Sequence, residues 1–493
     1  MIRDLFKSLE KNKKRIAFCI NDKEFSYEKL LEYTNCVIAQ LREAPELTSK
    51  VAGIVSYDSI LTYASILACW HEGLAYVPIN PNNPIFRNDL IIHQSGAEII
   101  LEAKVNDKAF LSADVKRIQL ETISPPEKNF ISDFRCIEGQ LLYILFTSGS
   151  TGSPKGVPIN ENNIIAFLDS YYRLGINPDH SDRCLQMFDL SFDVSVASYL
   201  IPLMFGSSVY TVNQEGVKYL KIYKLLRDKR ITYASLVPSV INLLKPYFSQ
   251  VVLPDLKMCI LTAEASSVDL VMEWSKCLPA SRIINLYGPT EATIWCTGYF
   301  FDPLSPKSYN GMLMIGKEFK NVFTVICNEN LEEVPVGSKG ELCLSSQQLT
   351  TGYLNNPEKN NTSFFLKDGK RFYKTGDVCY KTKDDEIFYC GRKDHQVKIQ
   401  GFRIELSEIE ECARSILKKQ AVVVSYLNKM NVNELALFYE AGLTDAKKLA
   451  DELSQKLPVY MIPSYIYPVK SFPVNDSGKI DRLQLVSMVV NNG

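Results

Sequence analysis

A donor-rich loop follows an apolar, strand-like run near residue 147. Residues 141–146 read LLYILF, and residues 147–156 read TSGSTGSPKG. Glycines let the backbone turn its N–H groups toward an anion, hydroxyls add further donors, and the lysine adds a positive charge. We therefore expect this loop to hold the phosphates of a nucleoside triphosphate. The residues with this expected role are Thr147, Ser148, Gly149, Ser150, Thr151, Gly152 and Lys155.

The loop is not a Walker A motif, although Gly149 and Lys155 approach the spacing of GxxxxGK[ST]. Pro154 stands where that motif has its last glycine, and Gly156 stands where it has the hydroxyl that binds magnesium. The alternative is a solvated Ser/Gly linker, but such linkers seldom follow an apolar strand directly and end in a lysine. We favour phosphate binding.

Strand-like and helix-like segments alternate around this loop. From about residue 140 to 290, short β-rich runs such as ITYASLV and KMCILT alternate with longer periodic stretches such as VKYLKIYKLLRDK. The first 120 residues show the same pattern, as in KVAGIVSY followed by SILTYASILACWHEG. The alternation predicts an α/β fold with parallel strands wrapped by helices. From about 296 to 390, short strands with Gly, Pro and Asn turns predict a β-rich subdomain.

A domain boundary is predicted near residue 393. After GRKDHQVKIQGFRIE the chain offers one amphipathic helix, two strands and another helix. These segments make a compact α+β unit of about 100 residues, within the usual size of a domain. We expect a large N-terminal core over 1–393, with its β-rich part at 296–390, and a small mobile C-terminal lid over 394–493.

Composition argues against several classes of function. The 55 basic and 56 acidic side chains give a net charge of -1, so we expect neither nucleic acid nor an anionic membrane as a partner. No export signal and no apolar run of membrane-spanning length is visible, which makes a cytoplasmic location the default. The 13 cysteines and four histidines lack metal-ligand spacing, and the CWH sequence ending at His71 is expected to be a packed helix face.

Seven segments together resemble the adenylate-forming superfamily, which includes acyl-CoA synthetases, luciferases, nonribosomal peptide synthetase adenylation domains and D-alanine:carrier protein ligases. They occur in the order typical of that family and cover most of the chain. The segments are YILFTSGSTGSPKGV (143–157), SFDVSV (191–196), NLYGPTEATI (285–294), GELCLS (340–345), YKTGDVCY (373–380), GRKDHQVKIQGFRIELSEIE (391–410) and NDSGKIDR (475–482). In such enzymes a carboxylate attacks the α-phosphorus of ATP, giving an acyl-adenylate and pyrophosphate, and a thiol then takes the acyl group.

The resemblance implies nucleotide and metal roles for individual residues. Glu291 would bind Mg²⁺ together with the ATP phosphates. Tyr287 would stack on adenine, with Asn285 near its amino edge. Asp377 would bind the ribose, and Arg392 would lie near the ribose or the α-phosphate. The turn that carries Glu291 also contributes Gly288 and Thr290; taken alone, YGPT could equally be a tight turn with a helix-capping threonine.

The resemblance also implies a lid that serves two steps. Lys479, in NDSGKID, would bridge the substrate carboxylate and the phosphate during adenylation. Asp394 would be the hinge about which the lid then rotates to admit a thiol. Lys398 and Gly401 would face the tunnel used in that second step.

The substrate residues point toward a small amino acid. Asp193 corresponds to the aspartate that binds the α-ammonium group in amino-acid-activating members, with Asp189 as a rival register. A buried carboxylate is costly unless it is paired, and a bound ammonium would pair it. The other pocket positions implied by the resemblance are Val194, Ala197, Ser235, Ile260, Thr262, Leu286, Ile294 and Trp295. The assignments of Ile260 and Thr262 could each shift by one residue, because TAEASS (262–267) departs from the family's usual pattern. Leu286 and Trp295 would fill the closed end, which leaves room for glycine, cysteine, serine or alanine, D-alanine included.

The predicted function is that of an ATP- and Mg²⁺-dependent ligase. It would activate a small amino acid and pass it to the phosphopantetheine thiol of a separate carrier protein, since the chain ends soon after Lys479 without a carrier segment. We expect it to act as a monomer. The alternatives are an acyl- or aryl-CoA ligase, for which Asp193 would be accidental, and a non-catalytic nucleotide-binding protein. The joint presence of Glu291, Asp377, Arg392 and Lys479 weighs against the last.

Overall fold

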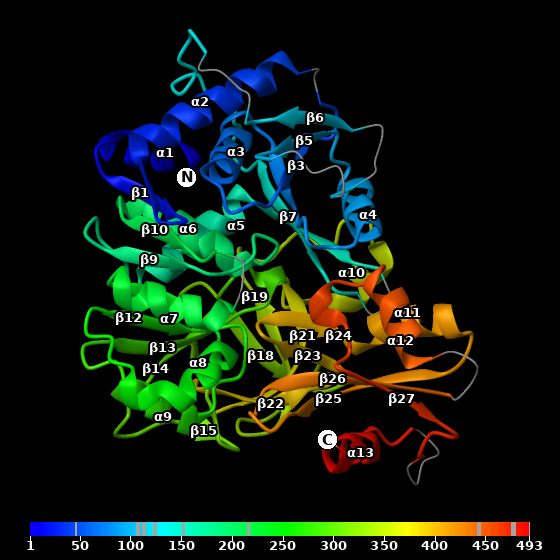
Figure 1. Ribbon diagram of the computed structural model, residues 1–493. Coiled ribbons are helices and arrows are strands. Elements are labelled where there is room, and N and C mark those ends of the chain that lie inside the picture. Colours follow the sequence, from blue (N-terminus) through cyan, green and yellow to red (C-terminus); the bar gives the residue numbers. More distant parts are fainter. Residues whose placement is uncertain are drawn as a thin grey trace.

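Two large sheets with surrounding helices build the N-terminal core (Figure 1). The computed structural model describes residues 1–44, 47–104, 109–110, 115–121, 126–149, 153–213, 217–440, 445–474 and 480–492. The smaller of the two sheets has six strands in the order β6-β5-β3-β4-β7-β8. Its strands are β3 (Val51–Val55), β4 (Ala75–Ile79), β5 (Ile99–Glu102), β6 (Lys116–Gln119), β7 (Leu141–Thr147) and β8 (Lys155–Asn160).

The second sheet has nine strands in the order β17-β14-β13-β12-β11-β9-β10-β1-β2. The strands from β13 to β1 run parallel, and β2, β14 and β17 add antiparallel edges. The predicted α/β fold with parallel strands is thus confirmed, but the strands are shared between two sheets. The nine strands are β1 (Ile16–Ile20), β2 (Lys23–Ser26), β9 (Arg183–Gln186), β10 (Ser208–Thr211), β11 (Tyr233–Leu236), β12 (Met258–Leu261), β13 (Arg282–Tyr287), β14 (Thr297–Phe300) and β17 (Lys317–Glu318).

Helices fill the space between the two sheets and cover their outer faces. Tyr199 of α6 has its hydroxyl 3.0 Å from that of Tyr76 in β4, and its ring meets Tyr63 of α3 edge-on. Because α6 packs on β9 and β10, these contacts join both sheets in one buried core. His71 ends α3 fully buried, as the packed-face prediction required. The helices of this core are α1 (Ile2–Lys11), α2 (Tyr27–Glu43), α3 (Ile60–His71), α4 (Ile85–Ser95), α5 (Glu161–Tyr172), α6 (Asp193–Phe205), α7 (Lys218–Asp228), α8 (Pro238–Leu244) and α9 (Val268–Lys276), with the 3-10 helices η1 (Lys245–Gln250) and η2 (Thr290–Ala292).

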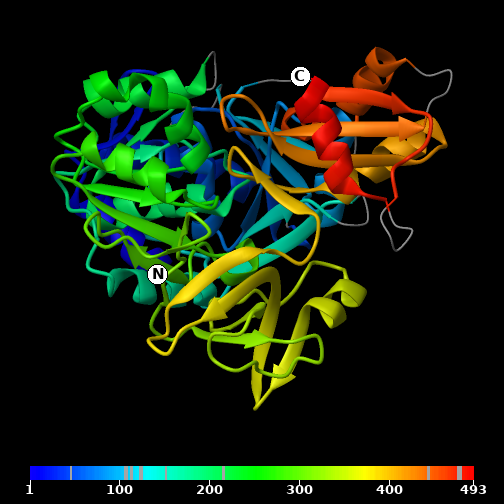
Figure 2. The same ribbon diagram turned by 90° about the horizontal axis from the view of Figure 1, so that it is seen from below.

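A five-stranded antiparallel sheet forms a separate lobe, drawn in yellow in Figure 2. The twelve-residue strand β21 pairs with β19, β20 and β22. Exposed Asp368 and Gly369 make the turn between β20 and β21, with φ of 49° and 72°. The elements are β18 (Phe323–Cys327), β19 (Gly340–Ser345), α10 (Pro357–Ser363), β20 (Phe364–Lys367), β21 (Lys370–Lys381) and β22 (Ile387–Arg392), and the short pair β15 (Ser308–Tyr309) and β16 (Met312–Leu313) precedes them.

The C-terminal lid begins with a hairpin and continues as a three-stranded sheet between helices (Figure 2). The lid hairpin, β23 with β24, comes directly after the predicted boundary. Helices α11 and α12 pack on one face of the sheet β25-β26-β27, and α13 packs on the other. The elements are β23 (Gln396–Ile399), β24 (Phe402–Glu405), α11 (Leu406–Leu417), β25 (Ala421–Leu427), β26 (Asn433–Glu440), α12 (Ala446–Ser454), η3 (Val459–Met461), β27 (Tyr465–Val469) and α13 (Arg482–Asn492).

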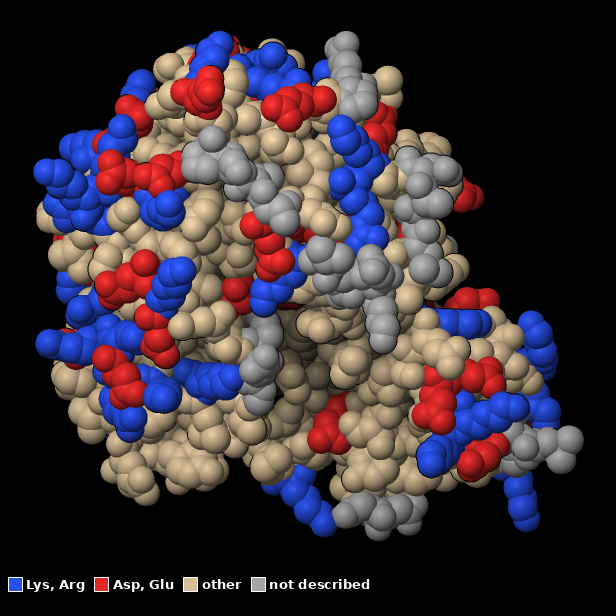
Figure 3. All heavy atoms as spheres, turned by 45° about the horizontal axis from the view of Figure 1, so that its top comes forward, with Lys and Arg blue, Asp and Glu red and all other residues tan. Residues whose placement is uncertain are grey.

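Charges of both signs are interspersed over the face shown in Figure 3. This mixture is consistent with the near-zero net charge of the sequence. Within the described ranges, no helix combines the length and the apolar character that crossing a bilayer requires.

Candidate nucleotide and substrate site

The phosphate loop is the connection of a β-hairpin. Strands β7 and β8 pair antiparallel with Thr147 opposite Lys155, so the ladder holds both ends of the loop together. A strand follows the lysine where a Walker A loop has a helix, which agrees with the rejection of that motif. Gly149 leaves no room for a side chain, because a Cβ there would lie 1.9 Å from the carbonyl oxygen of Ser153. The predicted residues Ser150, Thr151 and Gly152 lie outside the described residues.

Two side chains at the base of this loop suit an anionic ligand. The Thr147 hydroxyl is buried and has no hydrogen-bond partner in the described part of the chain. Lys155 is 7% exposed, with its Nζ 5.5 Å from the ring centroid of Tyr353. Burial lowers the pKa of Lys155 to about 8, and the charge of Arg403 acts in the same direction. A bound phosphate would counter both effects and keep the ammonium charged.

One cavity of about 110 Å³ brings together residues predicted for the nucleotide and for the substrate. The lid hairpin closes one side of it with Lys398, Gly401 and Arg403. The predicted residues that line it are Thr147, Ser148, Asp193, Val194, Thr262, Tyr287, Gly288, Thr290, Asp377 and Arg392.

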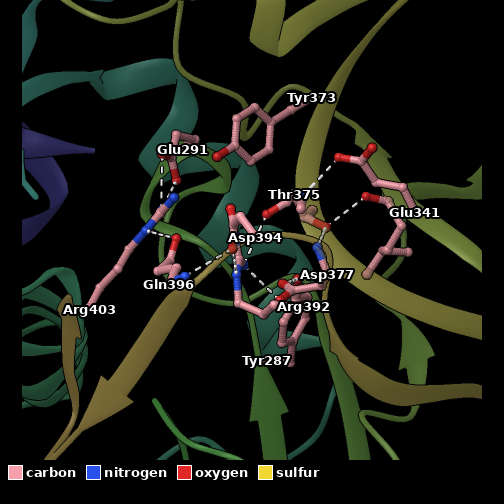
Figure 4. Close-up of polar contacts among 12 residues, drawn as sticks. Tyr287, Glu291, Glu341, Tyr373, Thr375, Asp377, Arg392, Asp394, Gln396 and Arg403 are labelled. Atoms are coloured by element: carbon pink, nitrogen blue, oxygen red, sulfur yellow. Dashed lines mark hydrogen bonds and ion pairs between the residues drawn. The ribbon is translucent and has the colours of Figure 1, made fainter. Parts of the chain in front are cut away.

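Asp377 lies in a bonded network on strands β21 and β22 (Figure 4). The strand register places it opposite Arg392, whose Nη1 donates to Asp377 Oδ1 at 2.7 Å. The Arg392 Nε donates to Asp394 Oδ1 at 2.7 Å, and the Tyr287 hydroxyl donates to Asp377. Gly376 has a φ of 74°, and a Cβ there would lie 2.5 Å from Arg392 Nη2. The glycine of TGD therefore lets the guanidinium reach the carboxylate, and the predicted hinge residue belongs to the same network.

Asn285 has partners away from the nucleotide. Its Nδ2 donates to the Met314 carbonyl at 2.9 Å, and its Oδ1 accepts from the Ser266 hydroxyl at 3.1 Å. It does not line the 110 Å³ cavity, unlike Tyr287 two residues later. Its role at the adenine edge stays a prediction.

Glu291 is completely buried and already holds a cation. It lies in η2, and the Tyr353 hydroxyl donates to its Oε1 at 2.6 Å. Arg403 Nη1 donates to Oε1 at 3.1 Å and to Oε2 at 2.9 Å (Figure 4). Burial alone would raise the pKa of Glu291, but Arg403 and then Tyr353 lower it to about 2. The carboxylate is therefore ionised at any physiological pH.

This carboxylate fits the chemistry of a magnesium site that phosphates complete. Mg²⁺ prefers oxygen ligands and is usually bound through one or two carboxylates plus substrate phosphates. Glu291 supplies one such carboxylate. Among the described residues, no group of three His, Cys, Asp or Glu side chains comes together as a protein-only metal site. The remaining ligands would have to be phosphate oxygens and water.

Asp193 is the opposite case, a buried carboxylate with no ion pair. It is the first residue of α6 and 8% exposed. Burial raises its pKa to about 6, although the hydroxyl of Thr290 and the N–H of Val194 act against that rise. No ion pair within the described ranges involves it. The rival Asp189 also lines the cavity, but its Oδ2 accepts from Asn80 Nδ2 at 2.7 Å.

A second, much smaller cavity of about 20 Å³ adjoins α6 at Ala197 and Ser198. The Trp295 Nε1 donates to Thr262 Oγ1 at 2.7 Å, and the Trp295 ring stacks on Tyr171. Because Thr262 lines the large cavity and Trp295 the small one, their bond lies between the two spaces. The predicted residues around the small cavity are Ala197, Ser235, Ile260 and Trp295, and Leu286 and Ile294 are buried in the adjoining core.

The sequence predicted no role for three residues of the site, Glu264, Arg403 and Glu408. Gly401 N donates to Glu264 Oε1 at 2.8 Å, so the tip of the lid hairpin is bonded to the N-terminal core. Arg403 and Glu408 belong to the segment 391–410, but their partners Glu291 and Arg87 are far away in the chain, so no local spacing indicates these pairs. Lys398, predicted for the second step, is partly buried, and desolvation lowers its pKa. Lys479 lies outside the described residues.

A larger cleft of about 750 Å³ lies on the other side of the lid hairpin. Residues of the N-terminal core, such as Glu264, and of the lid, such as Val486, form its walls. It shares four residues with the 110 Å³ cavity, so the two spaces adjoin: Arg392, Gln396, Lys398 and Gln400.

Comparison with known proteins finds similarity over nearly the whole chain. The model of the AMP-binding enzymes matches residues 5–354. Tyrocidine synthase 1 of Brevibacillus parabrevis is 32% identical over an alignment of 488 positions that covers 96% of this chain and 43% of that protein. Bacitracin synthase 3 of Bacillus licheniformis is 32% identical over 506 aligned positions, covering 98% of this chain and 8% of that protein. The chain spans less than half the length of either relative.

Solved structures share the fold. The adenylation domain AlmE of Vibrio cholerae, in complex with glycyl-adenosine-5'-phosphate, superposes with a TM-score of 0.88 at 24% identity, covering 99% of this chain and 97% of that one. The four-domain nonribosomal peptide synthetase AB3403, bound to AMP and glycine, gives 0.70 at 27% identity, covering 98% and 36%. These matches extend through the lid as well as the core.

Proposed function

We propose, on the premise that this chain belongs to the AMP-binding enzyme family, that it activates a small amino acid with ATP. The observation that carries this proposal is Asp193, a buried carboxylate without an ion pair among the described residues, in the cavity that also contains Asp377 and Tyr287. The ammonium group of an amino acid would supply the missing positive charge. An acid without an amine would leave a buried carboxylate unpaired, which is costly.

The first step joins the substrate carboxylate to the α-phosphorus of ATP and releases pyrophosphate, giving an aminoacyl-adenylate. Asp377 would accept hydrogen bonds from the ribose, while Ser148 and Lys155 would bind the terminal phosphates. Mg²⁺, held by Glu291 and those phosphates, would neutralise the charge of the leaving group. Lys479 is proposed to bring the two anionic reactants together. Such contacts position and stabilise charge, which is what phosphoryl-type transfer requires.

A small cavity about one turn along α6 from Asp193 supports a small side chain. This cavity of about 20 Å³ has room for about one water molecule. Trp295 and its bond to Thr262 stand between this space and the main cavity. Glycine, alanine, serine or cysteine would fit best. The similar protein AB3403 is bound to AMP and glycine, and AlmE is in complex with glycyl-adenosine-5'-phosphate.

In the second step a thiol would attack the carbonyl carbon of the adenylate, the C–O bond to phosphate would break, and AMP would leave. The 750 Å³ cleft adjoins the reaction cavity at Lys398 and Gln400, which makes it a route for a phosphopantetheine arm. We propose a carrier protein as the source of that arm. PA1221, a similar nonribosomal peptide synthetase protein, contains adenylation and PCP domains.

Pyrophosphate exchange into ATP tests the proposal directly. Purified protein is assayed with glycine, both enantiomers of alanine, serine and cysteine, larger amino acids, and acetate or benzoate as acids without an amine. Exchange with small amino acids is the expected result. Exchange only with the amine-free acids would identify an acyl- or aryl-CoA ligase. If no compound supports exchange although ATP still binds, the chain is a non-catalytic nucleotide-binding protein.

Two lid variants separate the steps. Lys479→Ala should reduce exchange by orders of magnitude while ATP binding in calorimetry persists, because the lysine is proposed to act as charge rearranges. Lys470→Ala removes another, exposed lysine of the lid and serves as the matched control. Asp394→Pro should impair thioester formation more than exchange. An unchanged exchange rate in Lys479→Ala, or equal losses in both steps for Asp394→Pro, would contradict these roles.

A further inference from the structure

We infer that the lid, as docked here, fills the proposed magnesium and phosphate subsites with its own Arg403 and Glu408, and that Arg87 of the N-terminal core is the positioning residue that holds Glu408 there. The inference rests on the proposed function, because that function assigns the two subsites. It adds a role for α4, an element outside the nucleotide site.

Arg403 occupies the place of the metal cation. Its Nη1 lies 3.1 and 2.9 Å from the two oxygens of Glu291, and its Nε donates to Gln396 Oε1 at 2.9 Å. The Tyr353 hydroxyl takes a further lone pair of the same carboxylate. A Mg²⁺ ion and this guanidinium would therefore compete for the same two oxygens.

Glu408 and its neighbours occupy the place of a phosphate. The Gly149 N–H, the type of donor that a phosphate loop offers its ligand, donates to Glu408 Oε2 at 3.0 Å. The Ser148 hydroxyl donates to the Arg403 carbonyl at 2.8 Å and accepts from the Glu405 N–H at 3.2 Å. Two described donors of the loop are thus already bonded to the lid.

Arg87 fixes the position of this carboxylate. Its Nη1 donates to Glu408 Oε1 at 2.7 Å, and the two side chains are only 7% and 1% exposed. A buried ion pair holds its partners firmly, because separating them leaves an uncompensated charge. Arg87 lies in α4 and is connected to the phosphate loop through Glu408.

The docked lid and Mg·ATP should therefore exclude each other, whereas AMP should be compatible with the lid. AMP lacks the β- and γ-phosphates and therefore does not need to bind at Glu291 or Gly149. The residues proposed for its nucleoside, Asp377 and Tyr287, still line an open cavity in the docked state. A ligand shifts a conformational equilibrium only by its difference in affinity for the two states, so the two nucleotides should act differently.

Hydrogen–deuterium exchange on the full chain tests this exclusion without catalysis. Backbone amides of residues 399–405 are followed with Mg·ATP in the absence of amino acid, or with AMP. We expect Mg·ATP to speed exchange in this segment and AMP to leave it slow. Arg87→Met should speed exchange without any ligand. The inference is overturned if the two nucleotides change exchange equally.

Calorimetry of the same proteins measures the coupling. Arg87→Met should tighten Mg·ATP binding relative to AMP by about fivefold or more, the lower range of coupling between sites. Glu408→Gln, which keeps the side-chain volume, should give the same shift and serves if Arg87→Met does not fold. Arg42→Met breaks a buried pair with Glu72 inside the N-terminal core and is the matched control.

The controls separate the possible failures. If Arg87→Met changes the ratio of Mg·ATP to AMP affinity no more than Arg42→Met does, the role of Arg87 is structural and the inference is wrong. If wild-type protein binds neither nucleotide, the proposed function fails and the inference fails with it. Binding of both nucleotides with an unresponsive hairpin overturns the inference alone.

Discussion

Two buried carboxylates, Asp193 and Glu291, have pKa values that shift in opposite directions. Asp193 has a pKa of about 6 and Glu291 a pKa of about 2, although burial acts to raise both. The difference comes from the partner, since Arg403 bonds to Glu291 and no ion pair among the described residues neutralises Asp193. The fold supplies a cation to Glu291 and, within the described ranges, none to Asp193, which is the position proposed for the ammonium group of the substrate.

Removing the unpaired carboxylate should have the largest effect. Asp193→Asn is expected to lower kcat/KM for the amino acid in pyrophosphate exchange by about 100- to 1,000-fold, as the loss of a buried ion-pair partner would. Calorimetry should show unchanged ATP affinity. Asp189→Asn, at the rival position in the same cavity, is the control. A greater loss in Asp189→Asn than in Asp193→Asn would move the ammonium site to Asp189.

Acid should weaken substrate recognition through the same group. Because the pKa of Asp193 is about 6 in the free protein, the carboxylate becomes protonated below that pH and can no longer pair with an ammonium. We expect kcat/KM for the amino acid to fall about tenfold per pH unit below 6. Thr290→Val removes a hydroxyl that lowers this pKa, so its profile should break at a higher pH. Coincident profiles would break the proposed link between Thr290 and Asp193.

The two carboxylates should affect stability with opposite signs. Since the pKa of Asp193 is raised on folding, its ionisation destabilises the protein as pH rises from about 4 to 6, and Asp193→Asn should raise Tm at pH 7.5 but not at pH 4. The gain is at most about 3 kcal/mol for two pKa units. The pKa of Glu291 is lowered on folding, so its charge stabilises the protein above about pH 4.5, and Glu291→Gln should lower Tm at pH 7.5. Scanning calorimetry measures these changes in Tm. Changes of the same sign for Asp193→Asn and Glu291→Gln at pH 7.5 would contradict the contrast between the two carboxylates.

The smallest effect concerns the cation of the phosphate loop. With a pKa of about 8 in the free protein, Lys155 loses its charge above that pH. ATP affinity should therefore fall severalfold between pH 7 and pH 9, since the neutral amine must take up a proton from solvent before it can pair with a phosphate. Lys155→Arg keeps the charge and should flatten the profile in equilibrium binding. A decline of the same size in Lys155→Arg would place the titrating group elsewhere.

Local sequence pattern predicted the alternating strands and helices of the core, and the resemblance pointed to residues, such as Asp193 and Asp377, that line one cavity. The spacing of apolar residues within one short segment is enough to predict a strand such as β11 or β12, or a helix such as α7. Short family motifs in the sequence identify the positions of Asp193, Glu291 and Asp377. The division of the strands into two sheets was not predictable in this way, because β1 pairs with β10, almost two hundred residues later, and no local period encodes that pairing.

The docked lid was also beyond local pattern. Arg403 and Glu291 are 112 residues apart, and Arg87 and Glu408 are 321 residues apart. In the sequence, each of these residues is indistinguishable from an ordinary surface charge. Their burial follows only from the way in which the N-terminal core and the lid pack together. Asn285 shows a related limit: it stands two residues before Tyr287 on one strand, yet its amide is bonded to Ser266 and Met314.

The turn between β20 and β21 gives this enzyme a place for immobilisation. Asp368 and Gly369 are exposed, and a side chain added at Gly369 would meet nothing within 4 Å. Exposed tips of this kind accept insertions well. An affinity peptide placed between these residues would tether the protein to a resin through its β-rich lobe and not through the lid.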